Sequence, residues 1–311
     1  MKVLVTGGAG FIGSHLLDRL TSLNDEVKVL DNLSSGSKAN MSSSIGRNMQ
    51  FILGDCTTTG DVREAMKDVD VLFHLAANAE VRLELNDPET CFQQNIYATH
   101  ILLEELRRST AQTIVFTSTS TVYGDVDLIP TPEDYPTRPI SIYGASKLAS
   151  EALITSYAHT YDLKAVILRL ANVVGPRSGH GVIHDFISKL KVNQKKLEIL
   201  GDGTQTKSYL HINDCIDALL QATAKSEGLT NIFNVGSQDQ INVKKIAKLV
   251  IDEMNLKDVA FQFTGGVDGG RGWRGDVKKM LLDVTKIESL GWKHKLSSKD
   301  AIVQTIRSLL N

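Results

Sequence analysis

Two side chains near the middle of the chain combine a candidate proton acceptor with a cation able to activate it. Tyr143 and Lys147 lie four residues apart in the run YGASK, a spacing that places both on one face of a helix. A free phenol has a pKa of about 10 and is a poor base at neutral pH, but a neighbouring ammonium group favours the phenolate. The spacing makes Tyr143 a candidate proton acceptor, although a helix with one buried tyrosine and one surface lysine would have the same spacing.

A glycine-rich turn near the N-terminus is a candidate binding site for the diphosphate of a dinucleotide. Gly7, Gly10 and Gly13 lie between the apolar run 2–5, typical of a buried parallel strand, and the helix-spaced leucines of 16–23. Glycine allows the backbone to turn tightly and approach a phosphate, and a helix N-terminus offers unpaired N–H groups to an anion. In this context the glycines predict a dinucleotide-binding turn rather than a ligand-free connection.

An acidic residue at the end of the second predicted strand indicates which dinucleotide binds. Residues 26–30 read as a strand, and Asp31 follows about 20 positions after the glycines, where a carboxylate can accept a hydrogen bond from a ribose 2′-hydroxyl. The same carboxylate would repel the 2′-phosphate of NADP, so NAD is the predicted cofactor. Lys38 and Arg47 in the next loop are cations that would soften this repulsion.

Alternating strands and helices must bring these residues to one cleft. Further strands are predicted at 50–54, 69–74, 113–117, 164–170 and 231–235. Helices are predicted at 59–67, 89–108, 142–160, 214–223, 242–254 and 299–310. This alternation predicts an α/β fold, a Rossmann-type doubly wound parallel sheet with a smaller C-terminal α/β lobe. Ligands bind beyond the carboxyl ends of the strands in such sheets, so the glycine turn and Asp31 should line one cleft.

The motifs together resemble a known family. The glycine turn, the run 117–124 (TSTSTVYG) and the Tyr143–Lys147 pair are similar to those of the extended short-chain dehydrogenase/reductases. Within that family the chain resembles the NAD-dependent nucleotide-sugar epimerases of the UDP-glucose (UDP-galactose) 4-epimerase type, from residue 2 to about 292. The likeness also includes the stretches 31–36, 54–56, 74–77 and 169–176 and the single residue Asn95.

The resemblance implies a reaction and three catalytic residues. Thr119, three residues before the Val-Tyr-Gly, would hydrogen-bond the 4-oxygen of the sugar while Tyr143 takes its proton. Lys147 would hold the nicotinamide ribose and lower the pKa of Tyr143. The implied reaction is epimerisation at C4 through a transient 4-ketose, with bound NAD regenerated in each cycle.

The resemblance also implies binding residues. Those expected to contact the cofactor are Gly7, Gly10, Phe11, Ile12, Gly13, Asp31, Asn32, Ser35, Gly36, Asp55, Cys56, Leu75, Ala76, Ala77, Asn95, Tyr143 and Lys147. Those expected to contact the nucleotide-sugar substrate are Thr119, Tyr143, Asn172, Val182, Leu200, Lys207, Arg271 and Arg274. Lys207 stands where the family usually has arginine, and a lysine lacks the planar fork that clamps a phosphate. No metal is expected, because His180 and His184 have no fitting third ligand apart from Asp185.

The implied organisation is two-domain and dimeric. The NAD-binding Rossmann domain is expected at 1–171 and 210–238, and the nucleotide-sugar-binding domain at 172–209 and 239–311. A homodimer is expected through helices 89–108 and 142–160. These helices carry apolar residues beyond one core face, namely Ile101, Leu102, Leu153, Ile154 and Tyr157.

Other functions of the same scaffold are weighed against two positions. Sugar dehydratases of the family carry Asp-Glu directly after the catalytic hydroxyl, and UDP-glucuronate decarboxylases carry Glu before the Val-Tyr-Gly. Ser120 and Thr121 occupy those positions here and supply no carboxyl group. A 4-reductase that consumes NAD(P)H stays open, and a non-enzymatic NAD-binding protein is disfavoured because the tyrosine, lysine and hydroxyl are all present.

Composition excludes several other classes. The 311 residues carry a net charge of −2, so nothing suggests a nucleic-acid or membrane surface. The cysteines Cys56, Cys91 and Cys215 lie far apart in apolar segments, which is typical of a reducing compartment such as the cytoplasm rather than of a disulfide framework.

Overall fold

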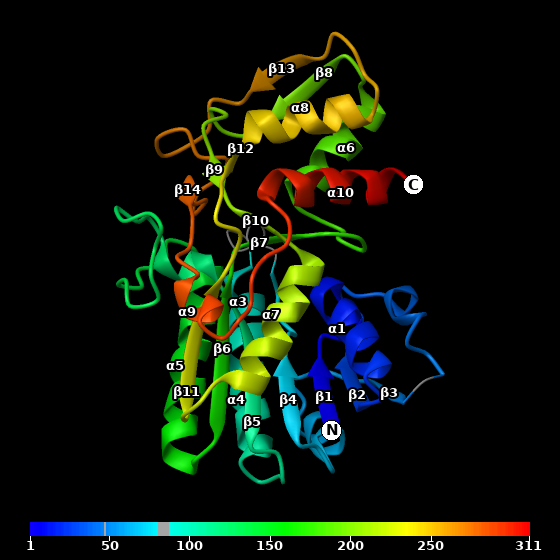
Figure 1. The fold of residues 1–311 in the computed structure, drawn as a ribbon, viewed down its shortest axis with the longest axis vertical. Coiled ribbons are helices and arrows are strands. Elements are labelled where there is room, and N and C mark those ends of the chain that lie inside the picture. Colours follow the sequence, from blue (N-terminus) through cyan, green and yellow to red (C-terminus); the bar gives the residue numbers. More distant parts are fainter. Residues whose placement is uncertain (47, 80–86) are drawn as a thin grey trace.

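A parallel sheet forms the centre of the fold, because the apolar runs of the sequence become strands buried on both faces. Residues 1–46, 48–79 and 87–311 are described in this computed structural model, so Arg47 lies outside them. The strand order is β11-β6-β5-β4-β1-β2-β3, and each neighbouring pair is parallel (Figure 1). The strands are β1 Lys2–Thr6, β2 Glu26–Asp31, β3 Met49–Leu53, β4 Val71–His74, β5 Thr113–Thr119, β6 Lys164–Leu170 and β11 Thr230–Val235. This order confirms the Rossmann-type doubly wound sheet.

Alternate residues of each central strand enter two separate hydrophobic clusters. In β1, Val3 and Val5 belong to one cluster, whereas Leu4 between them belongs to the other. Val5 is in register with Val29 of β2 and Phe73 of β4, so three apolar side chains lie side by side on one face. Both faces are therefore dry, which explains why these strands read as continuous apolar runs.

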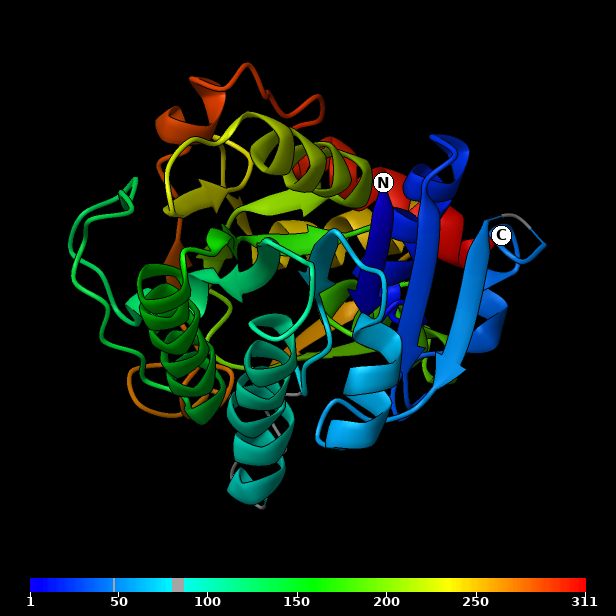
Figure 2. The same cartoon turned by 90° about the horizontal axis from the view of Figure 1, so that it is seen from below.

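Helices cover both faces of the sheet, as Figure 2 shows from below. One face is covered by α1 Phe11–Ser22 and α7 Ile212–Lys225. The other is covered by α2 Thr59–Met66, α4 Ala98–Leu106 and α5 Ile142–Tyr161. None of the described helices is long and apolar enough to cross a membrane.

A second layer of structure lies beyond the carboxyl ends of the strands, at the top of Figure 1. Its hydrophobic cluster is contributed by α6 Val182–Val192, α8 Val243–Glu253, α10 Ser298–Leu310 and β8 Lys196–Ile199. Its other strands are β7 Asn172–Val174, β9 Thr206–Lys207, β10 Tyr209–His211, β12 Ile241–Asn242, β13 Ala260–Phe263 and β14 Lys279–Met280. The short helices α9 Thr285–Glu288 and η1 Lys38–Met41 complete the elements outside the site. Although β14 pairs with β9, the buried apolar side chains of 277–292, including Met280 of β14, belong to the hydrophobic cluster that contains Val3 and Val5 of β1.

The predicted helix 89–108 is interrupted. It consists of α3 Pro88–Cys91, a π-helical turn η3 Phe92–Tyr97, and α4. A π-turn widens the backbone and releases carbonyl groups from the regular ladder, and such turns are frequent at functional sites. Side-chain periodicity alone does not reveal it.

Candidate active site

The glycine turn between β1 and α1 has no room for side chains. Gly7 has a φ of +72°, and a Cβ there would lie 2.7 Å from the backbone nitrogen of Ala76. A Cβ on Gly13 would lie 2.2 Å from the carbonyl oxygen of Gly7. Gly10 caps α1 without a side-chain hydrogen bond, so the first N–H groups of the helix face the cleft. This cradle fits the diphosphate of a dinucleotide.

Asp31 is both a ribose candidate and a fixed part of the turn. Its side chain is buried at the end of β2, where Oδ2 accepts a hydrogen bond from the backbone nitrogen of Ala9 at 2.9 Å. Oδ1 accepts a second one from Leu33 at 2.8 Å. Gly36 passes so close to Ala9 that a Cβ would lie 2.7 Å from its carbonyl carbon. The carboxylate therefore locks the glycine turn against the following loop, a role that sequence spacing does not reveal.

Several residues expected to contact the cofactor gather at the ends of β2 and β3. Asn32 donates to Asp55 Oδ2 at 2.7 Å, and Thr57 donates to Asp55 Oδ1 at 2.8 Å. Burial opposes ionisation of Asp55, but these hydrogen bonds outweigh it and lower the pKa of its carboxyl. Burial raises the pKa of the Cys56 thiol to about 12, so this side chain acts as a small neutral surface. Ser35 is exposed in the same loop region.

Helix α5, which carries Tyr143 and Lys147, begins beside the carboxyl end of β5. Ser141 caps it by accepting a hydrogen bond from the backbone of Gly144 at 3.0 Å, which fixes the first turn carrying Tyr143. Lys147 is 2% exposed, and its Nζ lies 4.1 Å from the ring centroid of Phe116 in β5. Within the described chain, no hydrogen bond or ion pair reaches this Nζ. A buried ammonium group without a polar partner fits the ribose hydroxyls of a bound dinucleotide.

Thr119 ends β5 and starts the next turn. Its hydroxyl caps the 3-10 helix η4, Ser120–Tyr123, by accepting from the backbone of Thr121 at 3.2 Å, and it lies 3.1 Å from Thr121 Oγ1. Burial raises the pKa of Tyr123 to about 12, so this second tyrosine near the site stays protonated and cannot serve as a base.

The π-turn η3 holds Asn95 between the segment that follows β4 and helix α5. Its Nδ2 donates to Ser146 Oγ at 2.8 Å, and its Oδ1 accepts from the backbone of Asn78 at 2.8 Å. Thr99 and Ser150 both donate to its backbone carbonyl within this π-turn. Asn95 is 2% exposed, so it positions the helix and the 75–78 segment from inside the protein.

The carboxyl end of β4 is anchored by a neutral histidine. His74 Nδ1 lies 2.8 Å from Thr6 Oγ1, and its Nε2 lies 3.0 Å from Thr99 Oγ1. Complete burial lowers the pKa of His74 to about 3, so the ring bridges β1 and α4 without charge. The backbone nitrogens of Leu75 and Ala76 donate hydrogen bonds to Thr6. The expected cofactor residues 75–77 therefore lie next to the glycine turn.

A buried ion pair below the site was not anticipated from the sequence. Arg169 Nη2 lies 2.8 Å from Glu151 Oε2, and both residues are at most 5% exposed. Ser118 donates to the other oxygen of Glu151. Arg169 Nη1 donates to the Tyr123 hydroxyl at 2.9 Å, and Tyr123 donates to Asn234 at 2.7 Å. The network joins α5, β5, β6 and β11, so it fixes the helix relative to the strand end of Thr119.

The candidate phosphate cations lie on or beside the loop 264–276. Arg271 is held in a two-pronged pair by Asp125 at 3.0 and 2.7 Å, close to η4. Lys207 Nζ lies 2.6 Å from Oδ1 of Asp276, an acid that is 3% exposed and was missed in the sequence. Arg274 is exposed and has no ion-pair partner among the described residues. The structure thus brings Lys207 and Arg271 together around Asp276, whose carbonyl also accepts from Arg271.

Three further residues expected to contact the substrate, Asn172, Val182 and Leu200, lie outside the loop 264–276. Asn172 donates to the backbone of Ser208 at 3.2 Å, and Val182 is the first residue of α6, whose N-cap Gly181 makes no side-chain bond. Leu200 accepts from the Gln205 side chain at 3.0 Å. Among the described residues, no hydrogen bond joins these three to one another.

Sheet order, glycine turn and buried lysine on α5 define a Rossmann-type, nicotinamide-dependent class of protein. A family model described as NAD dependent epimerase/dehydratase family matches residues 3–236. The chain is 35% identical to a putative UDP-glucose 4-epimerase from Methanocaldococcus jannaschii, over 99% of this chain and 98% of that protein.

Solved structures agree. A UDP-galactose 4-epimerase is 41% identical with a TM-score of 0.89, covering 100% of this chain and 99% of its own. A dTDP-glucose 4,6-dehydratase from Streptomyces venezuelae, solved with NAD, is 28% identical with a TM-score of 0.91, covering 100% and 97%. The chain therefore belongs to the NAD-dependent epimerase/dehydratase family, an enzyme family within the extended short-chain dehydrogenase/reductases. Its cofactor is NAD, as Asp31 predicts.

Proposed function

We propose that this enzyme epimerises a nucleotide sugar at C4, of the UDP-glucose/UDP-galactose type, through a transient 4-ketose. The observation that carries the proposal is the turn after Thr119. Ser120 and Thr121 present hydroxyl groups there, so neither position carries an acid. Thr121 Oγ1 lies 3.1 Å from Thr119 Oγ1. Elimination or decarboxylation would need a carboxyl group at these positions, whereas proton transfer at one hydroxyl needs only Tyr143 and its neighbours.

The proposed mechanism assigns one task to each side chain. Tyr143, as phenolate, takes the proton of the 4-hydroxyl, and Thr119 hydrogen-bonds the same oxygen. Lys147, as a buried cation, binds the nicotinamide ribose and favours the phenolate. NAD, when bound, supplies the hydride acceptor and donor. The 4-ketose would turn over in the pocket, so that the opposite face of C4 is presented to the cofactor, and Tyr143 would return the proton to the 4-oxygen.

Substrate recognition is proposed to use both halves of the molecule. Residues 1–171 and 210–238 would bind NAD, and 172–209 and 239–311 would hold the nucleotide sugar. Arg271 is the better phosphate candidate, because its planar guanidinium group binds both oxygens of the Asp125 carboxylate. It can exchange this carboxylate for a diphosphate. Lys207 is neutralised by the buried Asp276. Asn172, Val182 and Leu200 would flank the diphosphate and base.

The decisive experiment is incubation with a panel of nucleotide sugars, including UDP-glucose, UDP-N-acetylglucosamine, UDP-glucuronate and dTDP-glucose, with products read by NMR. The expected product is the C4 epimer, without net change in added NADH. A 4-keto-6-deoxy product would establish a dehydratase instead, and stoichiometric oxidation of NADH would establish a 4-reductase.

We expect Asp31→Asn to reduce the preference for NAD over NADP by about tenfold or more, because it removes a charge that repels the 2′-phosphate. Asparagine keeps one oxygen for the hydrogen bond from Ala9 but loses the acceptor of the Leu33 N–H, so the Tm of the variant is measured alongside. The measurement is the Kd of each dinucleotide for protein stripped of cofactor. Asp217→Asn, which removes the same charge from the surface of α7, is the control. An unchanged preference in Asp31→Asn would contradict this role.

A homodimer through α4 and α5 is also proposed, but on different residues from those expected. Leu102 and Ile154 are fully buried inside the protomer, and Ile101 is 8% exposed. Leu153 and Tyr157 pack against the same internal cluster. Ile101, Leu102 and Ile154 therefore belong to the core between the helices and the sheet and not to an outer face, whereas Leu153 and Tyr157 are partly exposed at the edge of that core.

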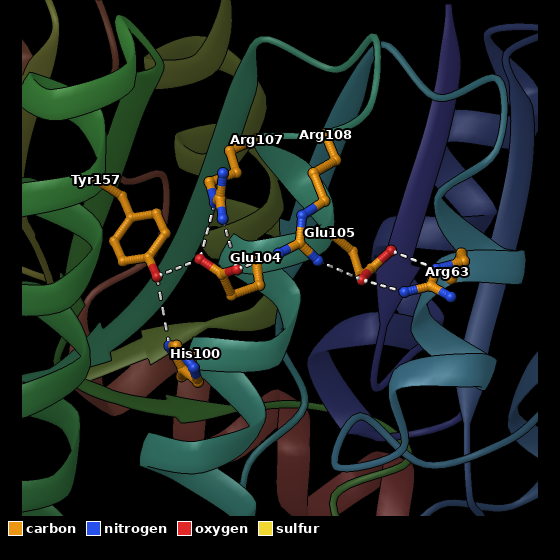
Figure 3. A network of polar contacts seen from close by, with 7 residues as sticks. All are labelled: Arg63, His100, Glu104, Glu105, Arg107, Arg108 and Tyr157. Atoms are coloured by element: carbon orange, nitrogen blue, oxygen red, sulfur yellow. Dashed lines mark hydrogen bonds and ion pairs between the residues drawn. The ribbon is translucent and has the colours of Figure 1, made fainter.

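The outer face of these helices carries aromatic rings instead. Phe92, Tyr97 and Tyr161 are 48%, 39% and 42% exposed. Beside them lies a charged network in which Tyr157 and Arg107 donate to Glu104 and lower its pKa to about 2 (Figure 3). Exposed rings bordered by charged pairs are typical of the centre and rim of an interface.

We expect the wild type to be dimeric by light scattering at micromolar concentration and Tyr97→Glu to be monomeric. The introduced charge would have to be buried without a partner in the dimer. Phe261→Glu, at a ring of similar exposure in β13, should leave the dimer intact. A monomeric wild type would contradict the proposal.

A further inference from the structure

The buried pair below the site lies on the same helix face as the catalytic lysine. Glu151 follows Lys147 by four residues on α5, so the two side chains are neighbours one turn apart. They are 3% and 2% exposed, so water screens their attraction little. Glu151 cannot swing away, because Arg169 Nε and Nη2 and Ser118 Oγ hold both of its oxygens.

The buried ammonium group of Lys147 needs a nearby negative charge in order to stay protonated. Burial lowers the pKa of its ammonium group to about 7, and the carboxylate of Glu151 is the largest influence acting in the opposite direction. The ring of Phe116 adds a cation–π contact but no charge. Other titratable groups around Lys147 come from the elements packed on α5. They are Cys91 of α3, His74 of β4, Tyr123 of η4 and Arg169 of β6, together with Tyr143 on α5 itself.

Apart from the phenolate that Tyr143 forms in the proposed reaction, these neighbours leave Glu151 as the counter-charge of Lys147. His74 is neutral because burial lowers its pKa to about 3, and Tyr123 keeps its proton. Cys91 lies 3.4 Å from Ser146 Oγ and 3.3 Å from Asn95 Nδ2 within a hydrogen-bonded cluster. Burial alone would lower the pKa of Arg169, but its hydrogen bonds to Glu151 raise it, so that pair stays charged.

We propose that Glu151 is a positioning residue, anchored by Arg169 and Ser118, whose carboxylate keeps Lys147 a cation inside the closed cleft. Arg169 would fix the carboxylate at the distance where it acts on Lys147 without capturing it in a direct ion pair. The lysine thus keeps its N–H donors for the dinucleotide while retaining its charge. The effect on turnover rests on the proposed function, whereas the effect on the lysine does not.

The test is the titration of Lys147, followed by NMR of lysine Cε groups in the complete protein and assigned with Lys147→Met. Glu151→Gln should shift the midpoint to lower pH by about one unit or more, the usual scale for losing an opposite charge at close range. With a pKa near 7 in the wild type, a one-unit shift lowers the cationic fraction at pH 7 from about one half to about one tenth. Glu151→Asp should keep the midpoint near that of the wild type.

Glu105→Gln is the matched control. Glu105 lies on α4, away from the site, is 5% exposed, and is paired with Arg63 of α2 and with Arg108. It should leave the midpoint unchanged. If Glu151→Gln fails to fold, the double variant Glu151→Gln/Arg169→Met is titrated instead, and the expected downward shift is smaller, because the repulsion between Arg169 and Lys147 is removed as well. An unmoved midpoint in either variant overturns the proposal.

The pH–rate profile gives a second reading. Because turnover needs cationic Lys147, the alkaline fall in rate should begin at lower pH in Glu151→Gln. A role confined to packing would reduce the rate evenly at every pH and leave the midpoint in place. A shifted lysine midpoint in an enzyme without epimerase activity would support Glu151 and reject only the proposed reaction.

Discussion

Tyr143→Phe should reduce turnover by about 10² or more while leaving the fold and bound NAD in place, the usual scale for losing a positioned acid or base. The substitution removes only a hydroxyl from a half-buried ring at the start of α5, and Ser141 continues to cap the helix. The measurements are kcat on the active nucleotide sugar, and cofactor content by absorbance and mass spectrometry of denatured protein.

Neighbouring variants separate proton transfer from binding. Thr119→Val should be milder, since it removes a hydrogen bond but keeps the base. Lys147→Ala should impair both cofactor retention and turnover. Tyr161→Phe, at the far end of the same helix, serves as the control and should retain wild-type kcat. Near-normal turnover in Tyr143→Phe with NAD still bound would refute the assignment and move the search to other groups in the cleft.

Arg169→Met should lower the thermal stability strongly. It leaves Glu151 as an uncompensated charge beneath the site, and breaking a buried pair in this way costs about 3–5 kcal/mol. For a chain of this size we expect Tm to fall by roughly 6–20 °C, at about 2–4 °C per kcal/mol. Calorimetry at fixed, saturating NAD keeps the cofactor contribution the same in both proteins.

Arg63→Met is the matched control for that loss. It breaks the pair with Glu105 from a side chain that is 61% exposed, and Glu105 keeps Arg108 as a second partner, so no carboxylate is left unpaired. Its Tm should therefore stay within a few degrees of the wild type. Equal Tm values for the two variants would show that the buried network does not stabilise the fold.

The sequence by itself determined the scaffold and the chemistry it displays. Buried parallel strands must be apolar on both faces, so the runs around Val5, Val29 and Phe73 predicted the sheet. Glycines at a strand–helix turn and Asp31 after the next strand predicted NAD, because these local rules depend on neighbours in the chain. The Tyr143–Lys147 spacing likewise follows from helix geometry.

Only the tertiary structure decided which polar groups meet across the molecule. Asp276, Lys207, Arg271 and Asp125 come from three separate segments, and no periodicity relates them. The hydroxyls of Thr99 in α4 and Ser150 in α5 meet at the Asn95 carbonyl in the π-turn. Helical periodicity also placed Leu102 and Ile154 on an outer face, although the packing of α4 against α5 and the sheet buries both. Long-range contacts carry such information, because a buried charge or carbonyl is satisfied by whichever partner the fold brings within reach.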